Sequence, residues 1–123
     1  MEILAGIKEI LADILDIEER EVTPETYIVR ELGAESIDLL ELAVSLNSRF
    51  RIEVNDDEIF LTRLRVHVTE AEEQGKDLVQ YLTERLPFLS NGRITEIVAD
   101  LEGGPTLKVK DLTDYIEWKR ENG

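Results

Sequence analysis

One serine, Ser36, lies where a side-chain hydroxyl could carry a covalently bound group. The run Leu32-Gly33-Ala34-Glu35-Ser36-Ile37-Asp38 predicts a loop that turns at Gly33, where positive φ costs nothing, and enters a helix at Ser36. Glu35 and Asp38 place negative charge in the first turn, which the helix dipole favours. A helix start offers unpaired N–H groups and partial positive charge to a phosphate. The segment therefore predicts a serine suited to carrying a phosphodiester.

Ser36 also has a simpler interpretation, because serine is a preferred N-cap residue and a lone serine before an apolar helix is usually only a cap. The two roles are compatible, since a serine can start a helix and still be modified. The combined spacing of Gly33, Ser36, Asp38 and the helix behind them favours modification.

Two helices and a long loop are predicted to position Ser36. Apolar residues at i, i+3, i+4 and i+7 predict a helix over residues 2–16, and a second helix follows over 36–50. The connection over 17–35 is long for a compact domain, and such loops are often functional. Within it, Thr23-Pro24-Glu25 predicts a short helical turn capped by Thr23.

The second helix carries two apolar stripes, although packing on a core needs only one. The predicted core stripe consists of Leu39, Leu42, Ala43, Leu46 and Phe50. The other stripe consists of Ile37, Leu40 and Val44. Either this second stripe packs beneath another part of the chain, or it is a docking surface for a partner.

The rest of the chain predicts further helices. Residues 51–68 are predicted as a loop with a helical turn near 57–61, although Leu64-Arg65-Val66-His67-Val68 alternates as a strand would. A capping-box pattern at Thr69 predicts a helix over 69–86. A turn at Ser90-Asn91-Gly92, a short helix over 93–102 and a last helix over 109–120 complete the prediction.

The Ser36 segment resembles the attachment site of acyl carrier proteins, a Leu-Gly-x-Asp-Ser-Leu-Asp run opening a helix that ends in Phe, here Phe50. Glu35 replaces the usual Asp, and Ile37 replaces the usual Leu. The resemblance implies that Ser36 carries 4′-phosphopantetheine covalently and that the thiol of this arm carries an acyl chain. It implies a non-catalytic carrier rather than an enzyme.

The resemblance covers residues 2–60 and about 106–118, with Asn55 in place of the family's proline. We therefore expect an all-α, acyl-carrier-like helix bundle with a long first loop and extra helices inserted before the C-terminal helix. Residues 1–123 would form one domain, with 61–105 as the inserted helical segment. Enlarged carriers of this kind resemble those that serve unusual or very long acyl chains, as in lipopolysaccharide lipid synthesis. The insertion could lengthen an apolar cavity for the chain or build a docking surface.

The resemblance also implies partners: a phosphopantetheinyl transferase, and synthases and acyltransferases of fatty acid or specialised lipid synthesis that present basic patches. The residues expected to dock them are Glu35, Ile37, Asp38, Leu40, Glu41 and Val44. Arg49 and Arg51 add positive charge to the end of this helix. Two alternatives remain: an aminoacyl or peptidyl carrier with the same arm, and an unmodified carrier-like interaction module.

Composition agrees with a carrier. With 28 acidic and 14 basic residues, the net charge of −14 opposes binding to nucleic acid or anionic membranes. The chain has no cysteine, signal-peptide pattern or membrane-spanning apolar run, so we expect a cytoplasmic protein. We also expect it to be a monomer. His67 is the only histidine, no phosphate-binding glycine loop is present, and Asn55-Asp56-Asp57-Glu58 lacks the spacing of a calcium loop, so neither a catalytic nor a metal site is predicted.

Overall fold

The computed structural model describes residues 2–122, and its regular elements in this range are helices, without any strand. The helices are α1 (Glu2–Leu15), α2 (Ser36–Phe50), α3 (Asp56–Ile59), α4 (Leu64–Glu73), α5 (Leu78–Arg85), α6 (Asn91–Ala99) and α7 (Val109–Asn122). Two short 3-10 helices, Glu19–Glu21 and Leu101–Gly103, lie in the connections. The predicted all-α, acyl-carrier-like bundle with extra helices before the last one is confirmed.

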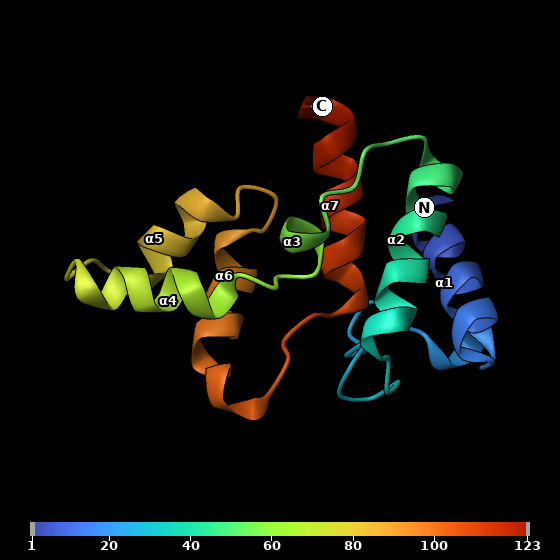
Figure 1. Ribbon diagram of the computed structural model, residues 1–123, viewed down its shortest axis with the longest axis horizontal. Helices are drawn as coiled ribbons and strands as arrows, with labels where there is room; N and C mark the ends of the chain where they lie inside the picture. The colour runs from blue at the N-terminus through green and yellow to red at the C-terminus, as the bar shows by residue number, and fades with distance from the viewer. Residues whose placement is uncertain (1, 123) are drawn as a thin grey trace.

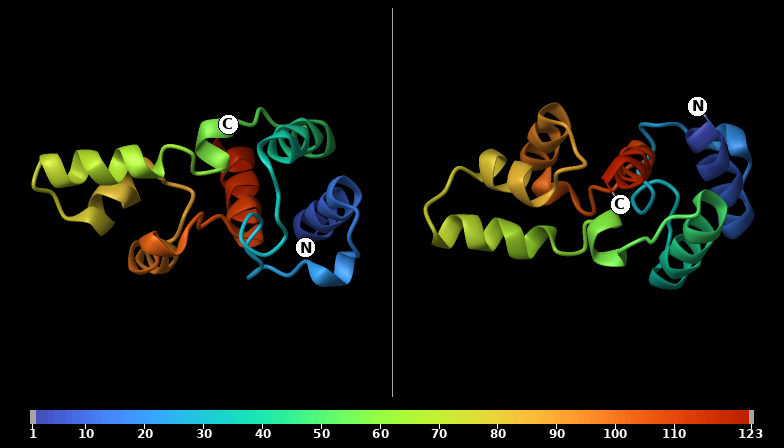
Figure 2. Two further views of the ribbon diagram at one scale, coloured as in Figure 1. Left: turned by 60° about the horizontal axis from the view of Figure 1, so that its bottom comes forward. Right: turned by 90° about the horizontal axis from the view of Figure 1, so that it is seen from above.

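The last helix, α7, lies between two groups of helices (Figure 1). On one side α1 packs against both α2 and α7. The short α3 also contacts α7. On the other side α4 packs against α5 and α5 packs against α6. The views in Figure 2 show the same order, with α7 between the α1–α2 pair and the inserted helices.

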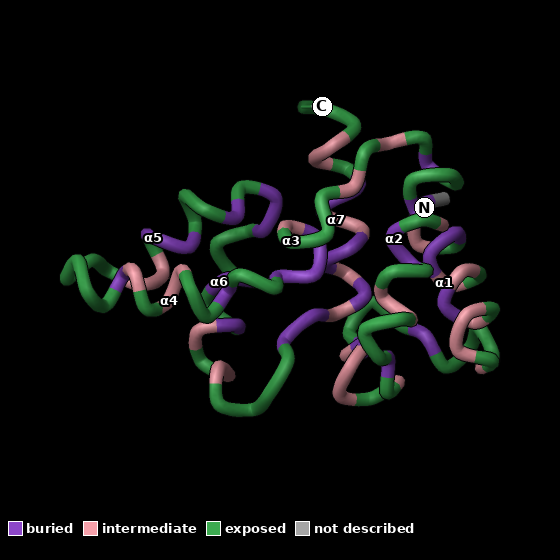
Figure 3. Tube along the Cα trace, in the orientation of Figure 1, coloured by how far each residue is buried: buried purple, intermediate pink, exposed green. Residues whose placement is uncertain are grey.

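The buried apolar residues form a cluster that runs from α1 and α2 through α7 into the insertion (Figure 3). Ile7 of α1 and Leu46 of α2 are fully buried, as are Ile116 of α7 and, in the inserted helices, Leu82 and Ile94. Burial of this kind stabilises a fold by roughly 1.5 to 3 kcal/mol for each large aliphatic side chain. The inserted helices therefore share the hydrophobic core of the rest of the chain.

An aromatic contact joins the insertion to α7. The rings of Phe88 and Tyr115 meet edge to face with centroids 5.0 Å apart. The Tyr115 hydroxyl donates a hydrogen bond to Glu58 of α3 and accepts one from the Asn55 backbone N–H. Tyr115 thus connects α3, α7 and the loop after α5.

The structure corrects the predicted helix over 69–86. The chain is already helical from Leu64, so the strand-like alternation at 64–68 belongs to the start of α4, and Thr69 lies in the middle of that helix. Gly75, with φ +64°, ends the run, and Asp77 caps α5 by accepting a hydrogen bond from Gln80 N–H. The apolar pattern is continuous along the chain, but the positive φ of Gly75 ends one helix and the N-cap at Asp77 begins another.

Three smaller predictions have mixed outcomes. The helical turn near 57–61 is present as α3, although it begins at Asp56. The helical turn predicted at Thr23 is wrong, because the 3-10 helix lies earlier and Thr23 begins a non-helical turn. The predicted turn at 90–92 is the start of α6, where Ser90 is the N-cap and its hydroxyl accepts a hydrogen bond from Arg93 N–H.

Candidate functional site

Ser36 is the first residue of α2 and its side chain is exposed. The N-cap is Glu35, whose backbone N–H donates a 2.8 Å hydrogen bond to the Asp38 carboxylate. Within residues 2–122, the Ser36 Oγ forms no hydrogen bond that would engage it in capping. The interpretation of Ser36 as an N-cap is therefore wrong, because Glu35 and Asp38 do this work and leave the hydroxyl accessible.

Gly33 forms the turn that brings the loop to Ser36, as the sequence predicts. Its φ of +71° lies in the left-handed region that glycine adopts freely. The Gly33 N–H donates to the Val29 carbonyl at 3.0 Å, and the next residue, Ala34, is buried. This tight turn places Glu35 and Ser36 at the start of α2.

The long loop is anchored to the segment before α7. Ile28 N–H donates to the Leu107 carbonyl at 3.1 Å, and Val109 N–H donates to the Thr26 carbonyl at 3.0 Å. Val22 and Ile28 of this loop are buried. Along the same loop, Tyr27 and Leu32 are half-buried.

A second anchor ties the loop to the insertion. The Arg30 guanidinium lies 2.7 Å from the Asp100 carboxylate and donates to the Gly104 carbonyl at 2.9 Å. The Tyr27 hydroxyl also donates to Asp100, at 3.0 Å. The hydrogen bond from Arg30, followed by that from Tyr27, lowers the pKa of Asp100. Nothing in the sequence pattern singles out Arg30 or Asp100, which lie 70 residues apart.

The second apolar stripe of α2 faces solvent. Ile37, Leu40 and Val44 are 68%, 59% and 67% exposed, respectively. The possibility that the insertion covers them is therefore excluded, because α4 to α6 lie on the far side of α7 (Figure 1). The core stripe lies as predicted: Leu42, Ala43, Leu46 and Phe50 are buried and Leu39 is half-buried.

Acidic residues border this exposed stripe near Ser36. Glu35 and Glu41 are exposed, whereas Asp38 is half-buried and its carboxylate is held by the cap of α2. At the other end of the helix, Arg49 pairs with Glu9 of α1 at 2.7 Å. This ion pair offsets the positive charge of Arg49, so the Ser36 end of α2 presents mainly acidic and apolar groups.

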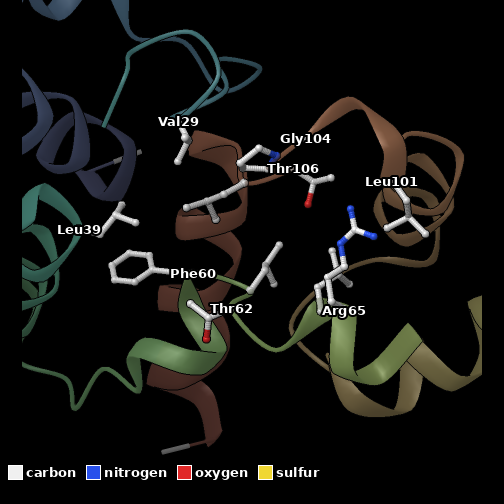
Figure 4. A pocket seen from close by; sticks show the side chains of 12 residues that line it. Val29, Leu39, Phe60, Thr62, Arg65, Leu101, Gly104 and Thr106 are labelled. Carbon is white, nitrogen blue, oxygen red and sulfur yellow. The ribbon is translucent and has the colours of Figure 1, made fainter. Parts of the chain in front are cut away.

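A cavity of about 440 Å³ lies beside α2, between the first group of helices and the insertion (Figure 4). Val29, Leu39 and Phe60 lie on one side of the cavity, and Arg65 and Leu101 lie on the other. Leu39 is one helical turn after Ser36, so the two side chains are neighbours on the helix surface. The helical periodicity predicts Leu39 as a core residue, whereas the structure places it, half-buried, in the wall of this cavity.

The Ser36 site fits a phosphodiester-linked group for reasons of geometry. Its hydroxyl is exposed at the N-terminus of a helix of 15 residues, where backbone N–H groups favour a phosphate. A largely apolar cavity is lined by Leu39, one helical turn further along α2. Within residues 2–122, none of the helices combines the length and apolar character needed to cross a membrane.

Comparisons with known proteins agree with this geometry. The family described as "Phosphopantetheine attachment site" matches residues 5–64, which run from α1 to the first residue of α4. An acyl carrier protein from Rubrobacter xylanophilus is 47% identical over 57 residues, covering 46% of this chain and 70% of the relative. One from Helicobacter pylori is 36% identical over 58 residues, covering 47% of this chain and 74% of the relative. No solved structure matches this chain.

The matched segment contains Gly33, Ser36 and the whole of α2, together with the loop that positions them. The prosthetic group of this family is covalently attached 4′-phosphopantetheine. The relatives match over most of their own length, whereas α4 to α6 of this chain lie almost entirely beyond the matched family segment. The chain belongs to the acyl carrier protein family.

Proposed function

We propose that Ser36 carries 4′-phosphopantetheine and that the protein delivers acyl chains to partner enzymes without catalysing a reaction itself. The observation that carries this proposal is the exposed Ser36 hydroxyl, left unused by the cap of α2 and placed at a helix N-terminus. The group, when bound, supplies a terminal thiol that holds the cargo as a thioester. The chain itself holds Ser36 exposed at the start of α2, and it caps this helix with Glu35 and Asp38 so that the Ser36 hydroxyl stays available.

The partner surface in this proposal is the Ser36 end of α2. Ile37, Leu40 and Val44 supply exposed apolar contact, and Glu35, Asp38 and Glu41 supply negative charge around it. An acidic rim around an apolar stripe complements a basic patch with an apolar centre, and opposite charges speed association. The partners would be a phosphopantetheinyl transferase, acyl-chain synthases and acyltransferases.

The cargo in this proposal is an acyl chain of fatty acid or specialised lipid synthesis, such as the lipid of lipopolysaccharide. The apolar lining of the cavity beside Leu39 supports an acyl group over an aminoacyl group, because methylene groups gain free energy from leaving water. The inserted helices, which the matched family segment barely reaches, support a specialised rather than a general role.

Intact mass after incubation with coenzyme A and a broad-specificity phosphopantetheinyl transferase tests the attachment site. Wild type should gain one phosphopantetheine unit and Ser36→Ala should gain none. Ser48→Ala is the matched control, because Ser48 is another exposed serine of α2, and it should gain the unit as wild type does.

Three other results would count against the proposal. Modification of Ser36→Ala would place the attachment elsewhere. No gain with several transferases would favour an unmodified interaction module that uses the same exposed stripe of α2. An amino acid or peptide released from the thiol of protein purified from cells would identify an aminoacyl or peptidyl carrier instead.

A further inference from the structure

The cavity beside α2 has walls from two parts of the chain that are distant in sequence. Leu39 and Phe60 belong to the segment that matches the carrier family, whereas Leu101 and Pro105 belong to the insertion. Its volume of about 440 Å³ lies within the range of roughly 300 to 1,000 Å³ that is common for small-molecule sites. The insertion therefore supplies one wall of a pocket that opens a single helical turn from Ser36.

The lining of this pocket is apolar apart from two threonines and one charged residue, Arg65 of α4. Figure 4 shows the Arg65 side chain directed toward Leu101 and Thr106, along the inserted side of the pocket. The ion pairs found among the described residues do not include Arg65. No acidic residue lines the pocket, although the chain has twice as many acidic as basic residues, 28 against 14.

We propose that the insertion builds the outer wall of the cargo pocket and that Arg65 selects acyl chains that end in a carboxylate. This inference rests on the proposed attachment of the carrier arm to Ser36. The methylene groups of such a chain would lie against Leu39, Phe60 and Leu101, and its terminal carboxylate would meet the Arg65 guanidinium.

The chemistry of Arg65 favours a carboxylate over other chain ends. A guanidinium presents a planar fork of donors that matches the two oxygens of a carboxylate, and charge-assisted hydrogen bonds of this kind are among the stronger ones. The nearby Thr62 hydroxyl already donates to Asp57 at 2.8 Å, so its proton is not available for cargo. A chain that ends in a methyl group would form no hydrogen bond with Arg65 and would displace water from its guanidinium.

Arg65 could instead only cover apolar surface with its stem while its charged end stays in water, as arginine often does. Such a residue would not distinguish between chain ends. The two roles are separated by comparing chains of equal length that differ only at their far end.

The test loads wild type with octanoyl-phosphopantetheine or its ω-carboxylated analogue, suberoyl-phosphopantetheine, from the corresponding coenzyme A esters. The readouts are the rate of thioester cleavage by hydroxylamine and the backbone amide chemical shifts of Leu101 and Thr106. We expect the suberoyl thioester to be cleaved about tenfold more slowly in wild type than in Arg65→Leu, the effect of one charge-assisted interaction. The octanoyl thioester should be cleaved at equal rates in both.

Two further variants control for charge and for folding. Arg65→Lys keeps the positive charge without the fork and should restore part of the protection. Arg63→Leu removes a charge from an exposed residue directly before α4 that does not line this pocket, and it should behave as wild type. Thermal melting of each variant confirms that the fold is retained.

The possible failures are distinguishable. A lack of mass gain in all variants would overturn the carrier proposal and this inference with it. Loading that succeeds, followed by equal cleavage of the suberoyl thioester in wild type and Arg65→Leu, would overturn the role of Arg65 alone. Unchanged shifts of Leu101 and Thr106 with both chains would overturn the insertion as a wall of the pocket.

Discussion

Arg93 and Asp111 form a buried ion pair that joins the insertion to α7. Arg93 Nε lies 2.7 Å from one carboxylate oxygen of Asp111, and Arg93 Nη2 lies 2.8 Å from the other. Arg93 also donates to the Thr106 carbonyl at 2.6 Å, and Asp111 accepts a 2.9 Å hydrogen bond from Lys108 N–H. Because Arg93 belongs to α6 and Asp111 to the first turn of α7, this pair holds the insertion on the carrier bundle.

Replacing Arg93 with leucine should cost about 3 to 5 kcal/mol of unfolding free energy, because the Asp111 charge would remain buried without its partner. Urea denaturation measures this loss. The matched control is Arg20→Ala, which removes an exposed pair with Glu18 and should cost less than about 1 kcal/mol. Equal losses in the two variants would contradict the idea that burial makes the Arg93–Asp111 pair costly to break.

We propose that residues 1–123 fold as one domain. A single unfolding transition in wild type, coincident by fluorescence and circular dichroism, would agree with this proposal.

Removing the Ser36 hydroxyl should leave stability almost unchanged. Ser36→Ala removes no hydrogen bond of the cap, so the expected loss of unfolding free energy is below about 0.5 kcal/mol. Ser90→Ala removes a true N-cap, whose hydroxyl accepts from Arg93 N–H, and should cost about 1 kcal/mol. A larger loss for Ser36→Ala than for Ser90→Ala, measured by denaturant titration, would return Ser36 to a capping role.

Two leucines of α2 should respond in opposite ways to truncation. Leu46 is completely buried, and Leu46→Ala should cost about 2 to 5 kcal/mol because it leaves a cavity in the core. Leu40 is mostly exposed, so Leu40→Ala should change stability by less than about 0.5 kcal/mol while slowing modification by the transferase. Thermal melts and initial modification rates check both expectations. A large stability loss in Leu40→Ala would show that the exposed stripe of α2 is part of the core.

Asp114 of α7 should make the protein less stable as the pH rises toward neutrality. Burial, together with the nearby charges of Asp111 and Glu117, raises the pKa of Asp114 to about 6 in the folded state. Its ordinary pKa is about 3.9, so the protonated side chain favours the fold below about pH 4, and this contribution is lost as the pH rises through about 6. Asp114→Asn should therefore be more stable than wild type at neutral pH, by about 1 to 3 kcal/mol.

The pH dependence separates this effect from a general gain of the asparagine variant. The difference in unfolding free energy between Asp114→Asn and wild type should grow between about pH 4 and 6 and then level off. A difference that is constant across this range would mean that Asp114 titrates normally in the folded protein.

Some errors of the sequence interpretation have a local cause. The preference of serine for the N-cap position suggests that Ser36 caps α2, yet Glu35 and Asp38 form the cap and leave the Ser36 hydroxyl unused. The prediction of one helix over 69–86 is wrong because Gly75 adopts a positive φ and Asp77 caps a new helix. Such local competition between caps and turns decides helix boundaries, which apolar periodicity alone defines poorly.

The sequence by itself determined the all-helical class, the turn at Gly33, the start of α2 at Ser36 and the two apolar stripes of that helix, because each of these depends on neighbouring residues along one segment. Only the tertiary structure decided that the stripe with Leu40 faces solvent, that Arg93 meets Asp111, and that Leu39 and Leu101 share a cavity. The spacing of residues on a helix shows which side chains share a face. What that face contacts depends on how segments distant in the sequence pack together, and the periodicity within one segment does not determine this packing.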